Sequence, residues 1–373
     1  MTGEPLRPLL VSPYGNIGGA QLVLLRLVDA MGDEFAPRGL VLDEGPVAKL
    51  LEERGVPTHV EPLPGKRAVL GFRRAAARVA EQLQGERISL VHANGIKAAV
   101  FGVPLSKRLG VPLVWMKHDH VMDGFVSSAV ASRCDGVICV SEAMANQFPA
   151  RIRKRVSVVY PGAEPVSNPA PVGDELLITC VGRLDPAKGF AQLLKATAVL
   201  RERGLDARIV VAGPVDRVHP GHAAELARLV GELGLGDHAK VGWVDDLEDV
   251  YTRARVAAIA SPPRRNGRPG EGAPIVLLEA MAYGRPVVAP REGGICEIVG
   301  DAGTFADDLT PEGLADALEP YLRDRARAAE VGARGRRRVE ERFTLGHTVD
   351  GLARVYRRLS GVTPRDGASA ATR

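Results

Sequence analysis

Residues 271–299 have the sequence EGAPIVLLEAMAYGRPVVAPREGGICEIV, in which a helix pattern precedes a strand pattern. Pro274 suits the first turn of a helix, and the apolar run after it has the length and composition of a buried helix. A Gly-Arg-Pro sequence then ends the helix ahead of the β-branched run VVAP. This stretch predicts a helix and a strand of an α/β fold, with Glu271 in the loop before the helix and Glu279 within it.

The same alternation of short β-branched runs and longer helical runs extends over the whole chain. The strand-like runs are RPLLVSP, GLVLDE, ISLVHAN, PLVWMKH and GVICVS in the first half, and ELLITCVGRL, ARIVVAGPV, AKVGWV, RVAAIASP and RPVVAP in the second. Such alternation is typical of a parallel sheet covered by helices, which assigns the chain to the α/β class.

A break in this alternation predicts a domain boundary. Residues 163–175, AEPVSNPAPVGDE, form a Pro-rich polar stretch typical of a linker. The length of 373 residues also indicates two domains at about 150 residues each. We therefore expect doubly wound domains at residues 1–165 and 166–345. We also expect a helix at about 346–360 to pack back onto the first domain, and a disordered tail at 361–373.

Composition and charge exclude several classes of protein. The chain lacks an apolar run of about 20 residues that would cross a membrane, and its first residues lack the pattern of a signal peptide. A net charge of +4 with 4% aromatic residues does not indicate a nucleic-acid partner. We expect a cytoplasmic protein. The cysteines form no C-x-x-C pair and are expected to be reduced packing thiols: Cys134, Cys139, Cys180 and Cys296.

The spacing of Glu271 and Glu279 suggests two contacts on one extended ligand. If both residues were helical, they would lie about 12 Å apart and about 80° apart around the axis. That distance is close to the separation of a ribose and a sugar joined through a diphosphate, which a helix N-terminus beside Gly272 can hold. The alternative is a solvated loop carboxylate and a lone polar residue on a helix. An ionised glutamate in an apolar helix needs a partner, which favours the ligand role.

The loop in ITCVGRLDPAKGF, residues 178–190, carries two cations. A strand ends near Gly182, and the next helix begins at Gly189 or Phe190, so Arg183 and Lys188 project from a tight strand-to-helix loop. An arginine fork and a lysine point charge suit a diphosphate leaving group, whose charge grows as its bond breaks. The alternative is a pair of solvated cations.

Two features of the first half offer weaker signals. Gly18 and Gly19 lie between a strand and a helix without the G-x-G-x-x-G spacing, and we expect them to let backbone approach a ligand. His118 follows a strand and can bond a sugar hydroxyl or stabilise charge at a reacting centre. His120 is an alternative to it, a packed histidine is the commoner case, and His92 is predicted to be structural.

Missing motifs argue against a nucleotide triphosphatase and against a metal. The chain has no G-x-x-x-x-G-K-[ST] phosphate loop and no Asp-x-Asp. His219 and His222 show no nearby carboxylates at an obvious metal spacing. We expect no metal and no other cofactor.

Taken together, these segments resemble the retaining GT-B glycosyltransferases of the family 4 type. The likeness covers nearly the whole chain and comprises GNIGGAQ, VPLVWMKH, DGVICVSEAMANQF, VVYPGAEP, VGRLDPAKGF, VGWVDDLEDVY and the E-x7-E signature that begins at Glu271. The resemblance implies a GT-B architecture, with two Rossmann-like domains facing one another across a cleft.

The resemblance also implies roles for individual residues. Arg183 and Lys188 would hold the donor diphosphate, and Glu279 the nucleotide ribose. Glu271 would contact hydroxyls of the donor sugar, and His118 would lie beside that sugar. These roles make the catalytic set His118, Glu271, Arg183 and Lys188. Further donor contacts are expected at Gly18, Gly19, Gly213, Val244, Gly272, Ala273, Pro274 and Ile275.

The implied reaction is metal-independent transfer of a sugar from a UDP- or GDP-linked donor to a hydroxyl, with retention of configuration. On a front-face route the leaving phosphate takes the acceptor proton, so no protein nucleophile is needed. Alternatives are an epimerase-like or nucleotide-sugar-binding protein without transfer, and a phosphorylase, for which no pyridoxal lysine is identified. Intact Arg183, Lys188, Glu271 and Glu279 favour a transferase.

The acceptor stays open between a small molecule and a lipid-linked one. A basic helical stretch at residues 65–83, GKRAVLGFRRAAARVAEQL, suggests peripheral contact of residues 66–78 with an anionic membrane, at its inner face. The alternative is a solvated helix face.

Overall fold

The computed structural model describes residues 4–63, 69–120, 122–263 and 270–362. It divides into two compact units, and each is described by itself. The first comprises the residues up to Pro161 and those from Leu345 onward, and the second comprises Gly162–Thr344. The sequence predicts the boundary between residues 165 and 166. Most of the predicted tail at 361–373 lies outside the described residues.

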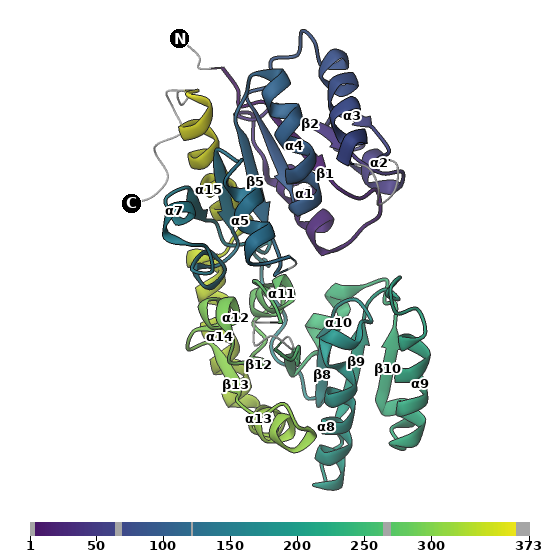
Figure 1. The fold of residues 1–373 in the computed structure, drawn as a ribbon. Helices are drawn as coiled ribbons and strands as arrows, with labels where there is room; N and C mark the ends of the chain where they lie inside the picture. The colour runs from purple at the N-terminus through teal and green to yellow at the C-terminus, as the bar shows by residue number, and fades with distance from the viewer. Residues whose placement is uncertain (1–3, 64–68, 121, 264–269, 363–373) are drawn as a thin grey trace. The chain divides into compact units, whose positions relative to one another are not determined.

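The first unit is built on a seven-stranded parallel sheet with the order β3-β2-β1-β4-β5-β6-β7, of which β1, β2 and β5 are labelled in Figure 1. Its strands are β1 (Pro8–Ser12), β2 (Arg38–Val41), β3 (Thr58–Val60), β4 (Leu90–Asn94), β5 (Leu113–Lys117), β6 (Gly136–Cys139) and β7 (Val156–Val158). Its helices are α1 (Gly19–Ala30), α2 (Pro46–Glu52), α3 (Val69–Gln82), α4 (Ile96–Leu109), α5 (Phe125–Ala131), α6 (Glu142–Ala145), α7 (Ala150–Arg153) and α15 (Leu345–Ser360).

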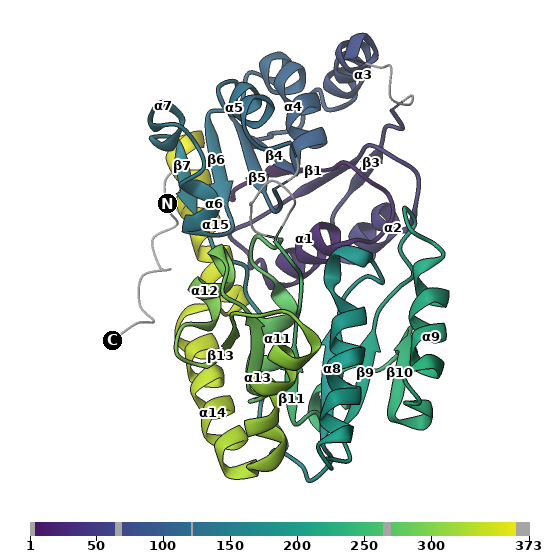
Figure 2. The same ribbon diagram turned by 60° about the horizontal axis from the view of Figure 1, so that its bottom comes forward.

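The second unit is built on a six-stranded parallel sheet with the order β10-β9-β8-β11-β12-β13 (Figure 2). Its strands are β8 (Leu177–Val181), β9 (Arg208–Ala212), β10 (Ala239–Gly242), β11 (Val256–Ala258), β12 (Val287–Pro290) and β13 (Gly303–Ala306). Its helices are α8 (Phe190–Glu202), α9 (His222–Glu232), α10 (Leu247–Arg253), α11 (Ile275–Ala282), α12 (Gly293–Val299), α13 (Pro311–Arg323) and α14 (Arg325–Arg342), with 3₁₀ turns η1 (Pro186–Lys188) and η2 (Gly236–His238).

Both sheets are doubly wound, which confirms the predicted α/β class. In each unit the chain first moves outward from a central strand and then crosses back to fill the other half of the sheet. Because parallel crossovers are right-handed, the two directions of winding put helices on opposite faces. In both views α3 lies beside α4, and α8 lies beside α13. The strand order reverses between β1 and β4 and between β8 and β11, and ligands of open α/β sheets bind at such points.

The helix and strand predicted within residues 271–299 are confirmed. Helix α11 begins at Ile275 with Pro274 as its N-cap and ends before Gly284, whose φ of +69° only glycine adopts readily. Strand β12 follows. Glu271 therefore lies in a loop and Glu279 in α11, so the separation worked out for two helical residues does not apply.

The Pro-rich segment 163–175 is irregular in structure but is held firmly to the second unit. Arginine side chains donate to four of its carbonyls: Arg336 to Val166 at 3.2 Å, Arg285 to Ala170 at 2.7 Å, Arg325 to Val172 at 2.6 Å and Arg255 to Gly173 at 3.0 Å. The segment, which begins beside the boundary between the two units, is thus a strap that these arginine side chains attach to the second unit.

The cysteines are reduced, as predicted. All four are free, Cys134, Cys139 and Cys180 are buried, and Cys296 is half-buried. Burial raises the pKa of the Cys134 and Cys139 thiols to about 12, so neither forms a thiolate at neutral pH.

Candidate functional site

The predicted donor residues of the second unit gather where its strand order reverses. Strand β8 pairs with β9 on one side and with β11 on the other. The loop after β8 carries Arg183 and Lys188, and the loop after β11 carries Glu271. Since the carboxyl ends of parallel strands share one edge of the sheet, these loops meet there although 83 residues separate Lys188 from Glu271.

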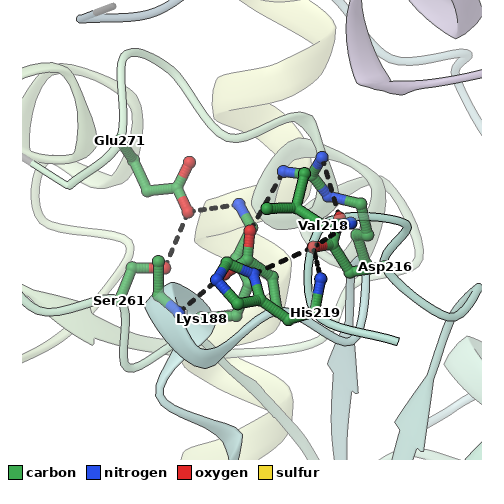
Figure 3. Close-up of polar contacts among 9 residues, drawn as sticks. Lys188, Asp216, Val218, His219, Ser261 and Glu271 are labelled. Carbon is green, nitrogen blue, oxygen red and sulfur yellow. Dashed lines mark hydrogen bonds and ion pairs between the residues drawn. The ribbon is translucent and has the colours of Figure 1, made fainter. Parts of the chain in front are cut away.

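Lys188 and Glu271 form the central ion pair of this edge (Figure 3). The Lys188 ammonium lies 2.5 Å from Glu271 Oε1, and the Ser261 hydroxyl donates to the same oxygen at 2.6 Å. The exposed fractions of the Lys188 and Glu271 side chains are 29% and 15%, so the pair is shielded but open to a ligand. Ser261 has no role in the sequence predictions.

Arg183 is oriented by two carboxylates. Its guanidinium lies 3.2 Å from Asp185 and 3.2 Å from Asp216, and the side chain is 53% exposed. Asp185 also caps η1, by accepting from the Ala187 backbone N–H at 2.9 Å. Each carboxylate engages one terminal nitrogen, Nη2 by Asp185 and Nη1 by Asp216, and the five N–H donors of the guanidinium leave others available to an anion.

Asp216 is the buried anchor of the neighbouring loop, and it was missed by the sequence analysis. Its side chain is 2% exposed and accepts from the backbone N–H groups of Val218 and His219 and from the His219 ring, at 3.1, 2.9 and 3.0 Å (Figure 3). Burial alone would raise the pKa of Asp216, but these donors and the charge of Arg183 outweigh it and lower that pKa.

The prediction that His219 and His222 lack nearby carboxylates at a metal spacing is wrong for His219. His219 pairs with Asp216, and His222 Nδ1 lies 2.9 Å from Glu225, each partner three residues away in the sequence. Ligand atoms of Asp185, Asp216 and His219 lie within 4.8 Å of one another, a spacing that can hold a cation. Arg183 contacts both carboxylates, at 3.2 Å each.

Glu279 projects from α11 toward a pair of tyrosines. Glu279 Oε2 accepts from the Tyr251 hydroxyl at 2.9 Å, and the Tyr251 ring stacks on Tyr283 with centroids 5.4 Å apart. Tyr251 is buried and Glu279 half-buried. The carboxylate thus has the hydrogen-bond partner that a buried glutamate requires.

The remaining predicted donor contacts have different environments. Gly272 and Pro274 are buried, while Ala273, Ile275 and Val244 are half-buried, Val244 in the loop after β10. Gly213 has a packing reason of its own, because a Cβ there would lie 1.9 Å from the Gly182 carbonyl oxygen. A side chain at position 213 would therefore separate the loops that follow β8 and β9.

The predicted residues of the first unit lie at the equivalent edge of their own sheet. Gly18 is the N-cap of α1 and Gly19 its first residue, with open space where a Cβ of Gly19 would lie. His118 follows β5, is half-buried, and its Nε2 lies 2.5 Å from Asn94 Oδ1. Asn94, at the end of β4, has no role in the sequence predictions.

The other two histidines of this unit are packed. His120 is 4% exposed and its Nδ1 lies 2.9 Å from Asp123, which also pairs with the buried Lys117. His92 is fully buried on β4 and bonds the Tyr356 hydroxyl at 2.7 Å, in agreement with its predicted structural role.

The basic stretch at residues 66–78 is described in part. Lys66 and Arg67 lie outside the described residues, Arg73 and Arg74 are exposed on α3, and Arg78 pairs with Glu61. Over the described ranges, no helix is both long and apolar enough to span a bilayer.

Comparison with known protein families gives two adjoining matches. Residues 17–166 match the model described as Glycosyltransferase Family 4, and residues 166–338 match that described as Glycosyl transferases group 1. The two matches together take in every predicted site residue.

Curated relatives are similar over part of their length. A GDP-mannose-dependent alpha-(1-6)-phosphatidylinositol monomannoside mannosyltransferase of Mycolicibacterium smegmatis is 34% identical over 170 residues, or 44% of this chain and 43% of the relative. A D-inositol 3-phosphate glycosyltransferase of Rhodococcus jostii is 31% identical over 310 residues, or 72% of this chain and 66% of the relative. The chain thus spans less than half of the first relative and 66% of the second.

Among solved structures, Anabaena Alr3699/HepE in complex with UDP and glucose has a TM-score of 0.79 at 23% identity. The alignment covers 94% of this chain and 98% of that chain. At this identity the likeness concerns the fold, which is of the GT-B class.

Proposed function

The chain belongs to the group 1, family 4 glycosyltransferases, and we propose that it transfers a sugar from a UDP- or GDP-linked donor to a hydroxyl acceptor. The transfer proceeds with retention of configuration and without a metal. The observation that carries the proposal is the Lys188–Glu271 pair of 2.5 Å, at the reversal point of the second sheet and in the same loop system as Arg183.

In this proposal, each charged group meets one part of the donor. Arg183 and Lys188 bind the diphosphate and stabilise the charge that develops on it as the sugar leaves. Glu271 accepts hydrogen bonds from hydroxyls of the donor sugar. Glu279, held by Tyr251, accepts from the ribose hydroxyls.

The chemical step is a front-face displacement. The bond between the anomeric carbon and the diphosphate oxygen breaks, and the acceptor oxygen bonds to the same face of that carbon. The acceptor proton passes to the leaving phosphate oxygen. The protein contributes positioning and charge stabilisation and needs no nucleophile.

Transfer is favoured over binding alone or epimerisation by the names of the relatives described above, a phosphatidylinositol monomannoside mannosyltransferase and a D-inositol 3-phosphate glycosyltransferase. Inositol phosphates and phosphatidylinositol mannosides are therefore the first acceptors to assay, with GDP-mannose and UDP-sugars as donors.

The test is thermal stabilisation of the protein by UDP, GDP, ADP and dTDP in the presence of a chelator. A ligand at 100 times its Kd adds about 2.7 kcal/mol of stability, so one nucleotide should raise Tm clearly. Arg183→Ala and Glu279→Ala should abolish the shift, and Arg228→Ala and Glu232→Ala, an exposed pair on α9, should preserve it. If none of the four nucleotides raises Tm, the donor site is refuted. If one raises Tm but no sugar is transferred to any acceptor, the binding alternative is supported.

Peripheral membrane contact through α3 is a separate proposal, supported by the exposed Arg73 and Arg74. Sedimentation with phosphatidylglycerol vesicles should be reduced by the double change to glutamate, while phosphatidylcholine vesicles should bind neither form. Equal binding of the variant and the unchanged chain to the anionic vesicles would refute it.

A further inference from the structure

Asn94 joins two features of the first unit that the sequence analysis treated separately. It is the last residue of β4 and is 1% exposed. Its Nδ2 donates to the Ala20 carbonyl at 3.0 Å, and its Oδ1 lies 2.5 Å from His118 Nε2. One side chain therefore links the first turn of α1, beside Gly18 and Gly19, to His118.

These contacts determine where the His118 ring carries its hydrogen. A backbone carbonyl only accepts hydrogen bonds, so the Asn94 group that faces Ala20 must be the NH₂. The Asn94 oxygen must then face His118. An amide oxygen only accepts, so the hydrogen of this bond belongs to His118 Nε2.

The ring has no second hydrogen at neutral pH. Burial is the main reason that the pKa of His118 falls from 6.5 to about 4; the charge of Lys117 adds to the lowering and that of Asp119 opposes it. A neutral imidazole with its hydrogen on Nε2 has a lone pair on Nδ1. Within the described ranges, no protein group bonds Nδ1.

We propose that Asn94 is a positioning residue that holds His118 with its hydrogen on Nε2, so that Nδ1 accepts a hydrogen bond from a hydroxyl group of the ligand. The assignment of the hydroxyl to the donor sugar rests on the proposed function. The position of the hydrogen on the His118 ring does not depend on that function. The assignment selects between the two roles left open for His118: it contacts a hydroxyl, and it does not act as a cation beside the leaving group.

The form of the ring is tested first on the unchanged protein, without any ligand. Long-range ¹H–¹⁵N correlation spectra of the histidine-labelled chain distinguish the two neutral forms from the imidazolium, and His118→Gln identifies the resonances. We expect a neutral ring protonated at Nε2 at pH 7. A hydrogen on Nδ1, or on both nitrogens, overturns the proposal whatever the chain catalyses.

Asn94→Asp tests the positioning role. The carboxylate cannot donate to Ala20, and its charge favours a protonated His118, so we expect hydrogen on both ring nitrogens at pH 7. Asn146→Asp, an exposed change in the same unit, should leave the His118 resonances unchanged. If Asn94→Asp unfolds, the spectrum of the unchanged chain still decides which ring nitrogen of His118 carries the hydrogen. A folded Asn94→Asp with an unaltered ring would refute the role of Asn94.

The ligand class is tested with donors in which each sugar hydroxyl in turn is replaced by hydrogen or by fluorine. A fluorine cannot donate, so both replacements at one position should weaken binding on the order of tenfold in the unchanged chain. This weakening should disappear in His118→Phe, which has no acceptor nitrogen. If replacement at no position weakens binding, although the parent donor binds and its sugar is transferred, His118 does not accept a hydrogen bond from the sugar. Failure of every donor to bind would instead refute the proposed function.

Discussion

The Lys188–Glu271 pair leads to a prediction about the free site. Without a ligand, the Lys188 ammonium is partly neutralised by Glu271 at 2.5 Å. A diphosphate that binds Lys188 must approach this carboxylate. Glu271→Gln removes the negative charge but keeps an oxygen that accepts from Lys188 and Ser261. We therefore expect Glu271→Gln to bind nucleoside diphosphate more tightly and to transfer sugar more slowly.

The size of the effect follows from the geometry of an ammonium group. Two acceptors on one tetrahedral nitrogen lie about 4 Å apart, and two unit charges at that distance repel by about 4 kcal/mol at an effective dielectric constant of 20. Exposure of the Lys188 and Glu271 side chains, at 29% and 15%, and salt reduce this value. A remainder of about 1.4 kcal/mol corresponds to tenfold tighter binding.

The assay is calorimetric titration with the nucleotide found by thermal stabilisation, at two salt concentrations. Glu232→Gln is the matched control, because Glu232 also forms an ion pair, with Arg228, but lies exposed on α9. The gain for Glu271→Gln should shrink at high salt, and the control should bind like the unchanged chain. Equal or weaker binding by Glu271→Gln would show that Glu271 does not oppose the diphosphate, and the assigned geometry would be wrong.

Three further predictions concern stability and the ribose contact. Burial, with a contribution from His118, lowers the pKa of His92 from 6.5 to about 3. The unfolded chain therefore binds this proton more readily, and the free energy of unfolding decreases as the pH is lowered from about 6.5. At pH 5 the free energy of unfolding, measured in urea, should be lower by about 2 kcal/mol, and His92→Gln should not show this decrease. The same pH dependence in both proteins would contradict a lowered pKa of His92. Arg285→Met removes the donor to the carbonyls of Tyr251 and Ala170 and should lower the free energy of unfolding by about 2 kcal/mol in the same assay. An unchanged free energy of unfolding would show that the strap, residues 163–175, does not need Arg285. Tyr251→Phe removes the donor to Glu279 and should weaken nucleotide binding about threefold to tenfold by calorimetry, and unchanged affinity would exclude an orienting role.

Local patterns in the sequence predicted the elements of the fold well. The Pro274 start and the Gly284 end of α11 depend only on backbone preferences of those residues, and both hold in the structure. The cation loop after β8 follows from a strand, a turn and a helix in direct succession. Such features need no knowledge of distant contacts.

Contacts between neighbouring strand ends could not be predicted in this way. Ser261 meets Glu271 because both follow β11 at the edge beside β8, and Asn94 meets His118 because β4 pairs with β5. Periodicity indicates that strands are parallel but does not give their order in the sheet. The Asp216–His219 pair is different, because a carboxylate three residues before a histidine was visible in the sequence and was overlooked.

The two reversal points differ in the charge of the side chains that end their strands. In the second unit the reversal point carries Arg183, Lys188 and Glu271, which suits a charged diphosphate and its polar neighbours. In the first unit the corresponding edge presents Asn94 and a neutral His118, while the charge of Lys117 is satisfied by Asp123 in the interior. A neutral imidazole can bond a hydroxyl group without attracting an anion. The same α/β winding thus ends in charged side chains at one reversal point and in an uncharged Asn94–His118 pair at the other, so the chemistry of each edge depends on the side chains that end its strands.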